Sequence, residues 1–250
     1  MMSNQTQPPS IHDDPPSPRR VQFHAHADED AWAWACAVAL AAILRRDLEQ
    51  RGQARLLLSG GTTPAPVYRA LSKAPLDWSR VDVTLVDERW LQPDDTDSNA
   101  HLVRETLLQN HAKAAHFEPL TRIGRTLEES VAGANAYARL PASAAVLGMG
   151  ADGHTASLFP GARDLSRALS SKADYVAFDA TGCPGAGAWP LRITLTPTGL
   201  SKARERLLLV RGDAKRRLLD RTLDSDDASV MPVRVAFSTP GATLQIHWCP

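Results

Sequence analysis

One stretch of the chain, residues 142–161, reads ASAAVLGMGADGHTASLFPG. Its first part, Ala142 to Leu147, is short and apolar, and it predicts a buried strand of a parallel sheet. Three glycines then follow within six residues and favour tight turns that let backbone approach a ligand. The turn carries Asp152 and His154, and a histidine oriented by a carboxylate is a candidate general base near neutral pH. The alternative is a structural turn whose histidine only caps the next helix.

On both sides of this stretch, short apolar runs alternate with amphipathic segments. Such alternation predicts an α/β fold with a mainly parallel sheet that helices cover on both faces. The apolar helix expected at 31–44 is rich in alanine and apolar all round, so it should pack within the protein. Strands are expected at 55–58, 81–86, 142–147, 192–196 and 206–210, with 233–237 and 243–248 closing the sheet. Further helices are expected at 64–72, 99–109, 126–140 and 214–223.

The composition excludes several classes of protein. The chain has 250 residues, 43% of them apolar, and its 28 basic residues balance 28 acidic ones, so no overall field attracts nucleic acid or an anionic membrane. The longest apolar run, at 31–44, is too short to span a bilayer and follows acidic residues, unlike a signal peptide. Cys36, Cys183 and Cys249 have neither metal-ligand nor disulfide-framework spacing, which fits a reducing cytoplasm.

The domain organisation follows from the same patterns. Residues 1–20 contain five prolines among polar residues without periodicity, and they predict a disordered tail. Residues 21–250 are expected to form a single α/β domain. Within it, the glycine-rich segment 181–187 is expected to be a surface loop.

Ligands of open α/β sheets bind beyond the carboxyl ends of the strands. The strand at 55–58 is followed by a segment with two glycines, two threonines and a proline that suits a helix start. Its N–H groups and hydroxyls predict a cradle for a phosphate, although an ordinary Gly-Gly turn with a threonine N-cap is the alternative. The residues of this cradle are Ser59, Gly60, Gly61, Thr62, Thr63 and Pro64.

Charged residues follow other strands. Asp87, Glu88 and Arg89 end a buried strand, where charges must either pair with one another or meet a ligand. Arg192, on a later strand, is a candidate anion contact. Lys215 falls in the first turn of a helix, where the dipole disfavours a cation unless an anion is near; a solvated lysine is the alternative. Together these donors and the Asp-His pair predict an enzyme acting on a small phosphorylated substrate, without an evident metal or cofactor.

These segments resemble the 6-phosphogluconolactonase family of the soluble bacterial type. The resemblance extends from residue 21 to the C-terminus, and the long glycine-rich motif is its most specific part. It implies the modified Rossmann-like three-layer sandwich shared by glucosamine-6-phosphate deaminases and ribose-5-phosphate isomerases. The segments that carry it are Ser59–Pro64, Asp87–Arg89, Asp97–Asn99, Gly148–Gly161, Arg192–Thr196 and Gly212–Lys215.

The resemblance also implies an activity, the hydrolysis of 6-phospho-D-glucono-1,5-lactone to 6-phospho-D-gluconate in the oxidative pentose phosphate pathway. His154 would activate water, Asp152 would orient it, and Arg89 would position the lactone or stabilise the oxyanion. The phosphate would be held by Gly60 to Thr62 together with Arg192 and Lys215. The implied protein is cytoplasmic, a monomer or weak homodimer, and needs no metal, cofactor, nucleic acid or membrane.

Two alternatives have sequence features against them. Amino-sugar phosphate deaminases or isomerases on this scaffold share the Asp-Gly-His turn, but they resemble the chain less because they carry a glutamate where this chain has Phe159. Asp87 matches a base of those enzymes and is expected here to be structural or to orient the substrate. A non-catalytic sugar-phosphate sensor is usually fused to a DNA-binding domain, for which residues 1–20 are too few, and His154 argues for turnover.

Overall fold

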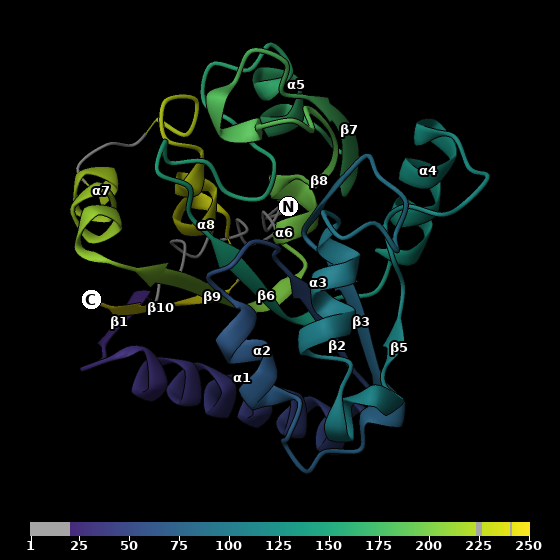
Figure 1. The fold of residues 1–250 in the computed structure, drawn as a ribbon, viewed down its shortest axis with the longest axis vertical. Helices are drawn as coiled ribbons and strands as arrows, with labels where there is room; N and C mark the ends of the chain where they lie inside the picture. Colours follow the sequence, from purple (N-terminus) through teal and green to yellow (C-terminus); the bar gives the residue numbers. More distant parts are fainter. Residues whose placement is uncertain (1–20, 224–226, 241) are drawn as a thin grey trace, which may run out of the picture.

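The computed structural model describes residues 21–223, 227–240 and 242–250, so the tail predicted for residues 1–20 lies outside the described part. A seven-stranded sheet crosses the molecule in the order β1-β10-β9-β6-β2-β3-β5, and every pairing in it is parallel (Figure 1). Its strands are β1 (Val21–Ala25), β2 (Ala54–Leu58), β3 (Val81–Leu85), β5 (His116–Phe117), β6 (Ala142–Gly148), β9 (Ala203–Arg211) and β10 (Thr243–Cys249).

A second, three-stranded sheet is antiparallel. Its order is β4-β8-β7, formed by β4 (Asp87–Arg89), β8 (Leu191–Leu195) and β7 (Tyr175–Asp179). The predicted strand at 192–196 therefore exists, but it belongs to this small sheet and not to the parallel one. The chain passes from the large sheet into the small one through Val86, whose N–H donates to the carbonyl of Leu58 at 2.9 Å.

Helices lie on both sides of the large sheet, as predicted. Figure 1 shows α1 along one face and the small sheet with α6 and α8 on the other. The helices are α1 (Glu29–Arg51), α2 (Ala65–Leu71), α3 (Asn99–Thr106), α4 (Leu127–Tyr137), α5 (Leu165–Ser170), α6 (Pro197–Leu200), α7 (Asp213–Leu223) and α8 (Val235–Ser238). Four 3₁₀ turns add η1 (Trp78–Arg80), η2 (Asn110–Ala114), η3 (Pro184–Ala186) and η4 (Pro232–Arg234).

The apolar helix predicted at 31–44 is the middle of α1. Asp28 caps its start by accepting the N–H of Ala31, and Gly52 ends it in the left-handed region with φ 76°. The expectation that this helix packs all round within the protein is wrong, because α1 is an outer layer against the sheet. Trp32 is fully buried, whereas Trp34 is 65% exposed on the other face.

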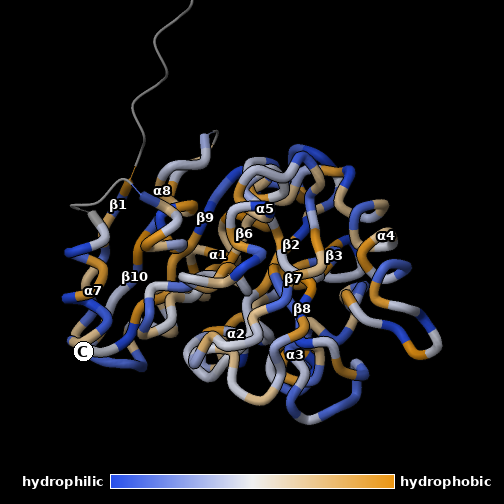
Figure 2. The backbone as a smooth tube through the Cα atoms, turned by 90° about the horizontal axis from the view of Figure 1, so that it is seen from above, coloured by the Kyte–Doolittle hydropathy of each residue, from blue (hydrophilic) through white to orange (hydrophobic). Residues whose placement is uncertain are grey.

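The core lies between the sheets and the helices, and Figure 2 shows the hydrophobic colouring along the central strands. Arg206 of β9 is only 1% exposed, yet its guanidinium reaches carbonyls of Ala236, Thr239 and Pro240. These bonds connect the segment around α8 to the sheet and pair both Nη atoms of the buried cation with backbone oxygens, while its Nε has no hydrogen-bond partner among the described residues. The side chain of Arg206 thus makes the hydrogen bonds to this segment that a neighbouring strand would have made through its backbone.

The strand predicted at 233–237 is wrong, because this segment forms η4 and α8. Pro232 lacks the N–H that a sheet ladder needs and suits a helix start. Val233, Ala236 and Phe237 are buried and recur at helical spacing i, i+3, i+4. Arg234 and Val235 between them are buried as well, so this short helical segment is enclosed on all sides.

Three imidazoles stack where β1 meets β10. The ring of His247 lies 4.7 Å from that of His24 and 5.4 Å from that of His26, and His26 Nε2 is 3.1 Å from His247 Nδ1. Burial, followed by the charges of His24 and His26, lowers the pKa of His247 from 6.5 to about 4. His247 is therefore neutral in the folded protein at pH values where the unfolded chain protonates it.

This difference predicts a pH-dependent loss of stability. Because the folded pKa lies below the unfolded one, the contribution is complete above pH 6.5 and is lost as the pH falls towards about 4. The loss should reach roughly 3 kcal/mol of unfolding free energy. Urea unfolding at a series of pH values should show a steeper loss for the wild type than for His247→Gln. Replacing the exposed His111 by Gln is the matched control, and profiles that are parallel for wild type and His247→Gln would contradict the expectation.

Candidate active site

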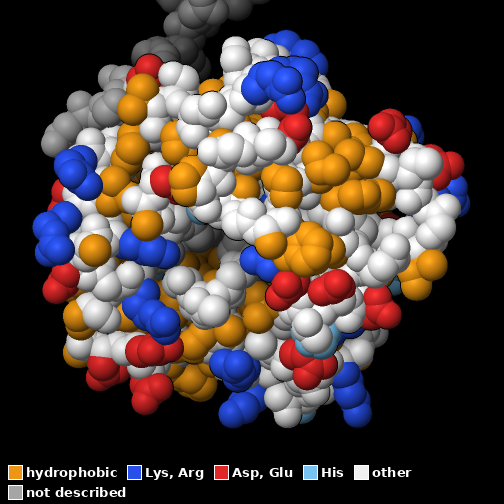
Figure 3. All heavy atoms as spheres, turned by 45° about the horizontal axis from the view of Figure 1, so that its top comes forward, with side chains coloured by type: hydrophobic (Ala, Val, Ile, Leu, Met, Phe, Trp, Pro, Cys, Tyr) orange, Lys and Arg blue, Asp and Glu red, His pale blue; other side chains and the backbone are white. Residues whose placement is uncertain are grey.

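A cavity of about 280 Å³ opens at the carboxyl ends of β2, β6 and β9. Parallel pairing brings these ends to one edge of the sheet, which is where ligands of such folds bind. Figure 3 shows the molecule hollowed near the middle of one face, with Lys and Arg side chains beside the hollow. The predicted site residues that line the cavity are Ser59, Gly60, Gly61, Thr62, Thr63, Asp87, Arg89, His154, Arg192 and Lys215.

The glycine-rich turn after β6 holds Asp152 against His154. His154 Nδ1 lies 2.6 Å from Asp152 Oδ1, and the backbone N–H of His154 donates to the same oxygen at 3.1 Å. Burial alone would raise the pKa of Asp152, but the hydrogen bond and charge of His154 outweigh it, so the pKa is lowered. An ionised Asp152 accepts the Nδ1 proton and leaves Nε2 of the cavity-lining imidazole as the basic nitrogen. The structure thus supports an oriented imidazole over a turn that only caps a helix.

Two neighbours fix the plane of the His154 ring. The Phe159 ring is fully packed, 1% exposed, with its centroid 4.4 Å from that of His154. A Cβ at Gly150 would lie 2.2 Å from His154 Nδ1, so only glycine leaves room for the imidazole. The imidazole of His154 therefore packs against the Phe159 ring and against the backbone of Gly150.

The segment 233–237, which was predicted to be a strand, holds this turn through a backbone hydrogen bond. The N–H of Val233 in η4 donates to the carbonyl of Gly153 at 2.9 Å. A Cβ at Gly153 would lie 2.9 Å from Met231 Sδ, and Gly153 has φ 83°. The position of the Asp-His pair therefore depends on a segment about 80 residues further along the chain, which local sequence could not reveal.

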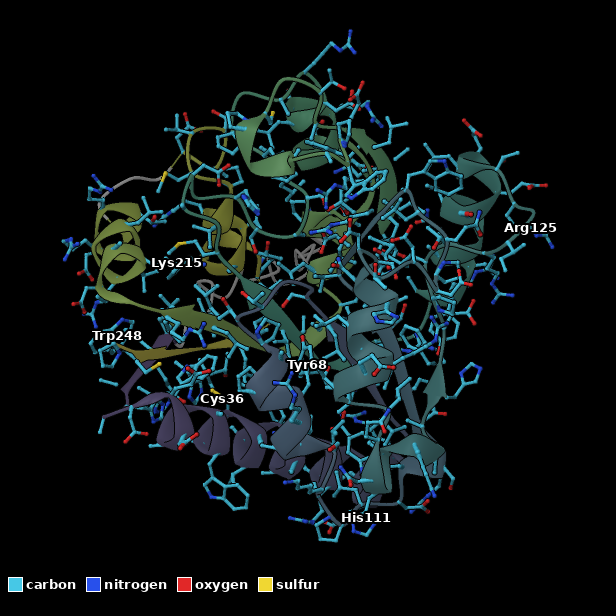
Figure 4. All side chains as sticks on the ribbon, in the orientation of Figure 1. Cys36, Tyr68, His111, Arg125, Lys215 and Trp248 are labelled. Atoms are coloured by element: carbon cyan, nitrogen blue, oxygen red, sulfur yellow. The ribbon has the colours of Figure 1, made fainter. Side chains whose placement is uncertain are left out.

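The loop after β2, which the sequence predicts to be a phosphate cradle, leads directly into α2. Gly61 adopts φ 84°, and α2 begins at Ala65 with Pro64 as its N-cap. No side chain caps α2, so the alternative in which a threonine serves as N-cap is not what the structure shows. Tyr68, labelled in Figure 4, donates its hydroxyl to the carbonyl of Ser59 at 2.8 Å and fixes the start of the loop. Ser59 Oγ is buried without a hydrogen-bond partner, which leaves one donor available there.

The acidic and basic groups after β3 do not neutralise one another. Within the described residues no ion pair joins Arg89 to Asp87 or Glu88, which were the alternatives to a ligand. Asp87 is 6% exposed and accepts the hydroxyl of Ser157 at 2.5 Å. Arg89 donates through Nη1 to the carbonyl of Asp97 at 2.7 Å, and both Asp87 and Arg89 line the cavity.

Arg192 reaches the cavity by a route different from the one expected. It is the second residue of β8 and pairs opposite Arg89 in the small antiparallel sheet, whereas the sequence predicted that its strand belongs to the parallel sheet. Because β8 runs antiparallel to β4, its start lies beside the end of β4. The guanidinium donates to the carbonyls of Trp189 at 2.6 Å and Ala186 at 2.8 Å. Burial lowers the pKa of Arg192, partly offset by Asp87.

Lys215 lies in the first turn of α7 at the rim of the cavity (Figure 4). Burial and then the charge of Arg211 lower its pKa, while Asp152 acts in the opposite direction. The side chain is half-buried, so the alternative of a fully solvated lysine does not describe it.

Several lining residues were missed by the sequence analysis. Gly185 comes from the segment 181–187, which was expected to be only a surface loop; it also borders the cavity, and a Cβ there would lie 2.5 Å from Asp152 Oδ2. The local signal was the glycine itself, but its partner is far away in sequence. Asn99, Met149, Ala156 and Phe159 line the cavity too; the sequence placed them in the segments that carry the family resemblance but gave them no role in binding the substrate.

Two further features bear on the chemistry of the site. Across the described ranges, no group of three His, Cys, Asp or Glu residues is arranged to hold a metal ion. The helices in those ranges include none that is long and apolar enough to cross a membrane.

Comparison with known proteins gives the relationship. The family of glucosamine-6-phosphate isomerases and 6-phosphogluconolactonases matches residues 27–248. The chain belongs to this family. A protein of Xylella fastidiosa (strain 9a5c) named 6-phosphogluconolactonase is 58% identical over 212 residues, which cover 84% of this chain and 88% of that protein. Another of that name, from Pseudomonas aeruginosa, is 40% identical over 84% of this chain and 87% of its own length.

Solved structures of the family share the fold. A 6-phosphogluconolactonase from Shewanella baltica OS155 superposes with a TM-score of 0.85 at 35% identity and covers 92% of this chain and 98% of its own. A monomeric glucosamine-6-phosphate deaminase superposes with a TM-score of 0.71 at 18% identity, covering 90% of this chain and 96% of its own. The expected likeness to the deaminase scaffold is therefore confirmed at the level of fold.

The packing around His154 yields a prediction about Gly150. In Gly150→Ala the new Cβ would overlap the imidazole, so the hydrogen bond between His154 and Asp152 should break while the protein stays folded. The ¹⁵N NMR signal of His154 Nδ1 should then move towards that of a free imidazole. Gly133→Ala is the control, because a Cβ there meets nothing within 4 Å. An unchanged Nδ1 signal in Gly150→Ala would show that the ring has room to spare.

Proposed function

We propose that this protein hydrolyses 6-phospho-D-glucono-1,5-lactone to 6-phospho-D-gluconate, as the oxidative pentose phosphate pathway requires. The observation that carries the proposal is the arrangement of two kinds of group around one cavity. An oriented imidazole lies on one wall, and a cradle of N–H groups with nearby cations lies on another. The names of the relatives at 58% and 40% identity support the same activity.

His154 is the proposed general base. Its Nε2 takes a proton from water while the water oxygen attacks the lactone carbonyl, and Asp152 stabilises the imidazolium that forms. The tetrahedral intermediate then collapses, the bond to the ring oxygen breaks, and that oxygen receives the proton. The products are one carboxylic acid and one hydroxyl group, so the step consumes one water and no other reactant.

Arg89 and Asp87 are assigned to the lactone itself. Arg89 lines the cavity and is fixed through the carbonyl of Asp97, so it can stabilise negative charge that develops on the carbonyl oxygen. Asp87 is held by Ser157 and accepts a hydroxyl of the substrate in an orienting role.

The phosphate is assigned to the cradle and two cations. Ser59, Gly60, Gly61, Thr62 and Thr63 offer backbone N–H groups and hydroxyls to an anion at the end of β2. Arg192 and Lys215 lie on the same cavity and add charge-assisted donors. No step in this scheme needs a metal or a cofactor.

The competing amino-sugar phosphate deaminase requires a further acid beside the histidine. Phe159 occupies that place here, 4.4 Å from the His154 ring between centroids. An apolar ring cannot relay a proton, so the environment of His154 suits hydrolysis better than ring opening. We also propose that residues 21–250 act as one domain, in the cytoplasm, as a monomer or weak homodimer with no nucleic-acid or membrane partner.

His154→Ala should abolish nearly all activity without unfolding the protein. A positioned base contributes about 10²–10⁴-fold to the rate, and nothing else on the cavity wall replaces the imidazole. The assay generates the lactone in place and detects 6-phosphogluconate with its dehydrogenase. His111→Ala, an exposed histidine away from the cavity, is the control. Near-normal turnover by folded His154→Ala would exclude His154 as the base.

Lys215→Ala should lose most of the preference for the phosphorylated lactone over the unphosphorylated one. The cation binds the phosphate in this proposal, so kcat/KM should fall chiefly on the phosphorylated substrate. Lys113→Ala, an exposed lysine, is the control. An equal proportional loss on both lactones would place Lys215 outside the phosphate site.

Arg192→Ala should show the same selectivity loss together with lower stability. Its guanidinium holds two backbone carbonyls that would be left unpaired. Melting temperature and the ratio of kcat/KM on the two lactones measure the two effects separately. A change in stability without a change in that ratio would make Arg192 purely structural.

A further inference from the structure

Glu88 is a buried carboxylate that the proposed reaction does not use. It is fully buried, and its two oxygens accept three backbone N–H groups, each at 2.8 Å. Oε1 accepts from Arg89 and Asn99, and Oε2 accepts from Ala100. Burial raises the pKa of Glu88 to about 7, against the effect of these three donors. Burying a carboxylate costs folding free energy, so the contacts that Glu88 makes call for an explanation.

A helix cap alone does not account for this arrangement. The helix α3 already has Ser98 as its N-cap, which accepts the N–H of His101 at 2.9 Å. Glu88 takes the two N–H groups before that one and the N–H of its own neighbour Arg89. The carboxylate therefore joins the start of α3 to β4, the strand that precedes this helix in the chain.

Asn99, the first residue of α3, connects this contact between α3 and β4 to the cavity. The Asn99 amide donates from Nδ2 to the carbonyl of Asp87 at 2.8 Å. A Cβ at Gly60 would lie only 1.8 Å from Asn99 Oδ1, so the Asn99 side chain occupies the space beside the phosphate cradle. Asn99 thus spans the gap between β4 and the cradle, and it lines the cavity itself.

The contact between α3 and β4 fixes both the backbone and the guanidinium of Arg89. Its backbone N–H is bound to Glu88, and its guanidinium donates to the carbonyl of Asp97, just before α3. A shift of α3 relative to β4 would therefore move Arg89 and Asn99 together. These residues border the parts of the cavity assigned to the lactone carbonyl and to the phosphate.

We propose that Glu88 is a positioning residue of the lactone site. It acts through Arg89 and Asn99, setting the distance between the group that stabilises the carbonyl and the loop that binds the phosphate. The inference rests on the proposed function for the identity of the substrate. In structural terms, Glu88 keeps a fixed distance between the subsite for the lactone carbonyl and the subsite for the phosphate.

Glu88→Gln is the first test. Glutamine keeps the size of the side chain, but its amide nitrogen cannot accept the N–H that one carboxylate oxygen accepted. A loss of about 10- to 100-fold in kcat/KM is expected, since small misplacements of positioning groups have effects of this size. Asp47→Asn is the matched control: Asp47 is 1% exposed, is bound to Arg204 at 3.0 Å and does not line the cavity. Asp47→Asn should lose melting temperature but keep kcat/KM, and equal kcat/KM losses in both variants would overturn the proposal.

A double-mutant cycle with Asn99→Ala tests the route of the effect. If Glu88 acts through Asn99, Glu88→Gln should lose a smaller factor in the Asn99→Ala background than in the wild type. Full additivity would overturn the proposal. Should Glu88→Gln fail to fold, Glu88→Asp replaces it in the cycle, because aspartate keeps the charge but shortens the side chain, and the same criterion of additivity decides.

The failure of the proposed function can be told apart from the failure of this inference. A wild-type protein without lactonase activity would exclude the function. The cycle would then be measured as affinity for inorganic phosphate by calorimetry, and the same criterion of additivity decides. An active wild type with an unaffected, folded Glu88→Gln would exclude only the role of Glu88.

Discussion

Parallel pairing of β6 between β2 and β9 is the constraint on which the site depends. Because the three strands run in the same direction, the loops that follow them must all start from one edge of the sheet. The imidazole, the phosphate cradle and Lys215 come from three separate segments, and no contact between those segments is needed to bring them together. The pairing of the strands brings these segments together, and the loops determine only the local backbone conformation.

Local shape is set by glycine at two points where backbone and side chain meet closely. At Gly150 the imidazole lies where a Cβ would be, and at Gly60 the Asn99 amide does. In both cases the absence of a side chain lets a functional group from elsewhere approach the loop. The glycines therefore act less by bending the chain than by leaving room, which explains why the turn after β6 and the cradle after β2 can border the same cavity.

The sequence predicted those parts of the structure that depend on neighbours along the chain. Most helices and strands follow from periodicity, and the contact between Asp152 and His154 follows from the turn residues around it; the structure contains these elements and this contact. Arg192 was misplaced because the direction of β8 depends on β4, about 100 residues earlier. The segment 233–237 was misassigned because a five-residue apolar run has no length from which to tell a strand from a helical turn. Gly185, Phe159 and Asn99 acquire their places from packing across the fold, which one sequence does not display.

The position of β1 has a consequence for how the chain assembles. Its partner in the sheet is β10, and His26 and His247, which join them, are 221 residues apart. During synthesis from the N-terminus, β1 is made long before β10, so its native partner in the sheet does not yet exist. His24 in β1 and His26 just after it are polar, and polar side chains at a sheet edge discourage pairing with other chains. The native pairing of β1 therefore becomes possible only when the last strand of the sheet, β10, has been made.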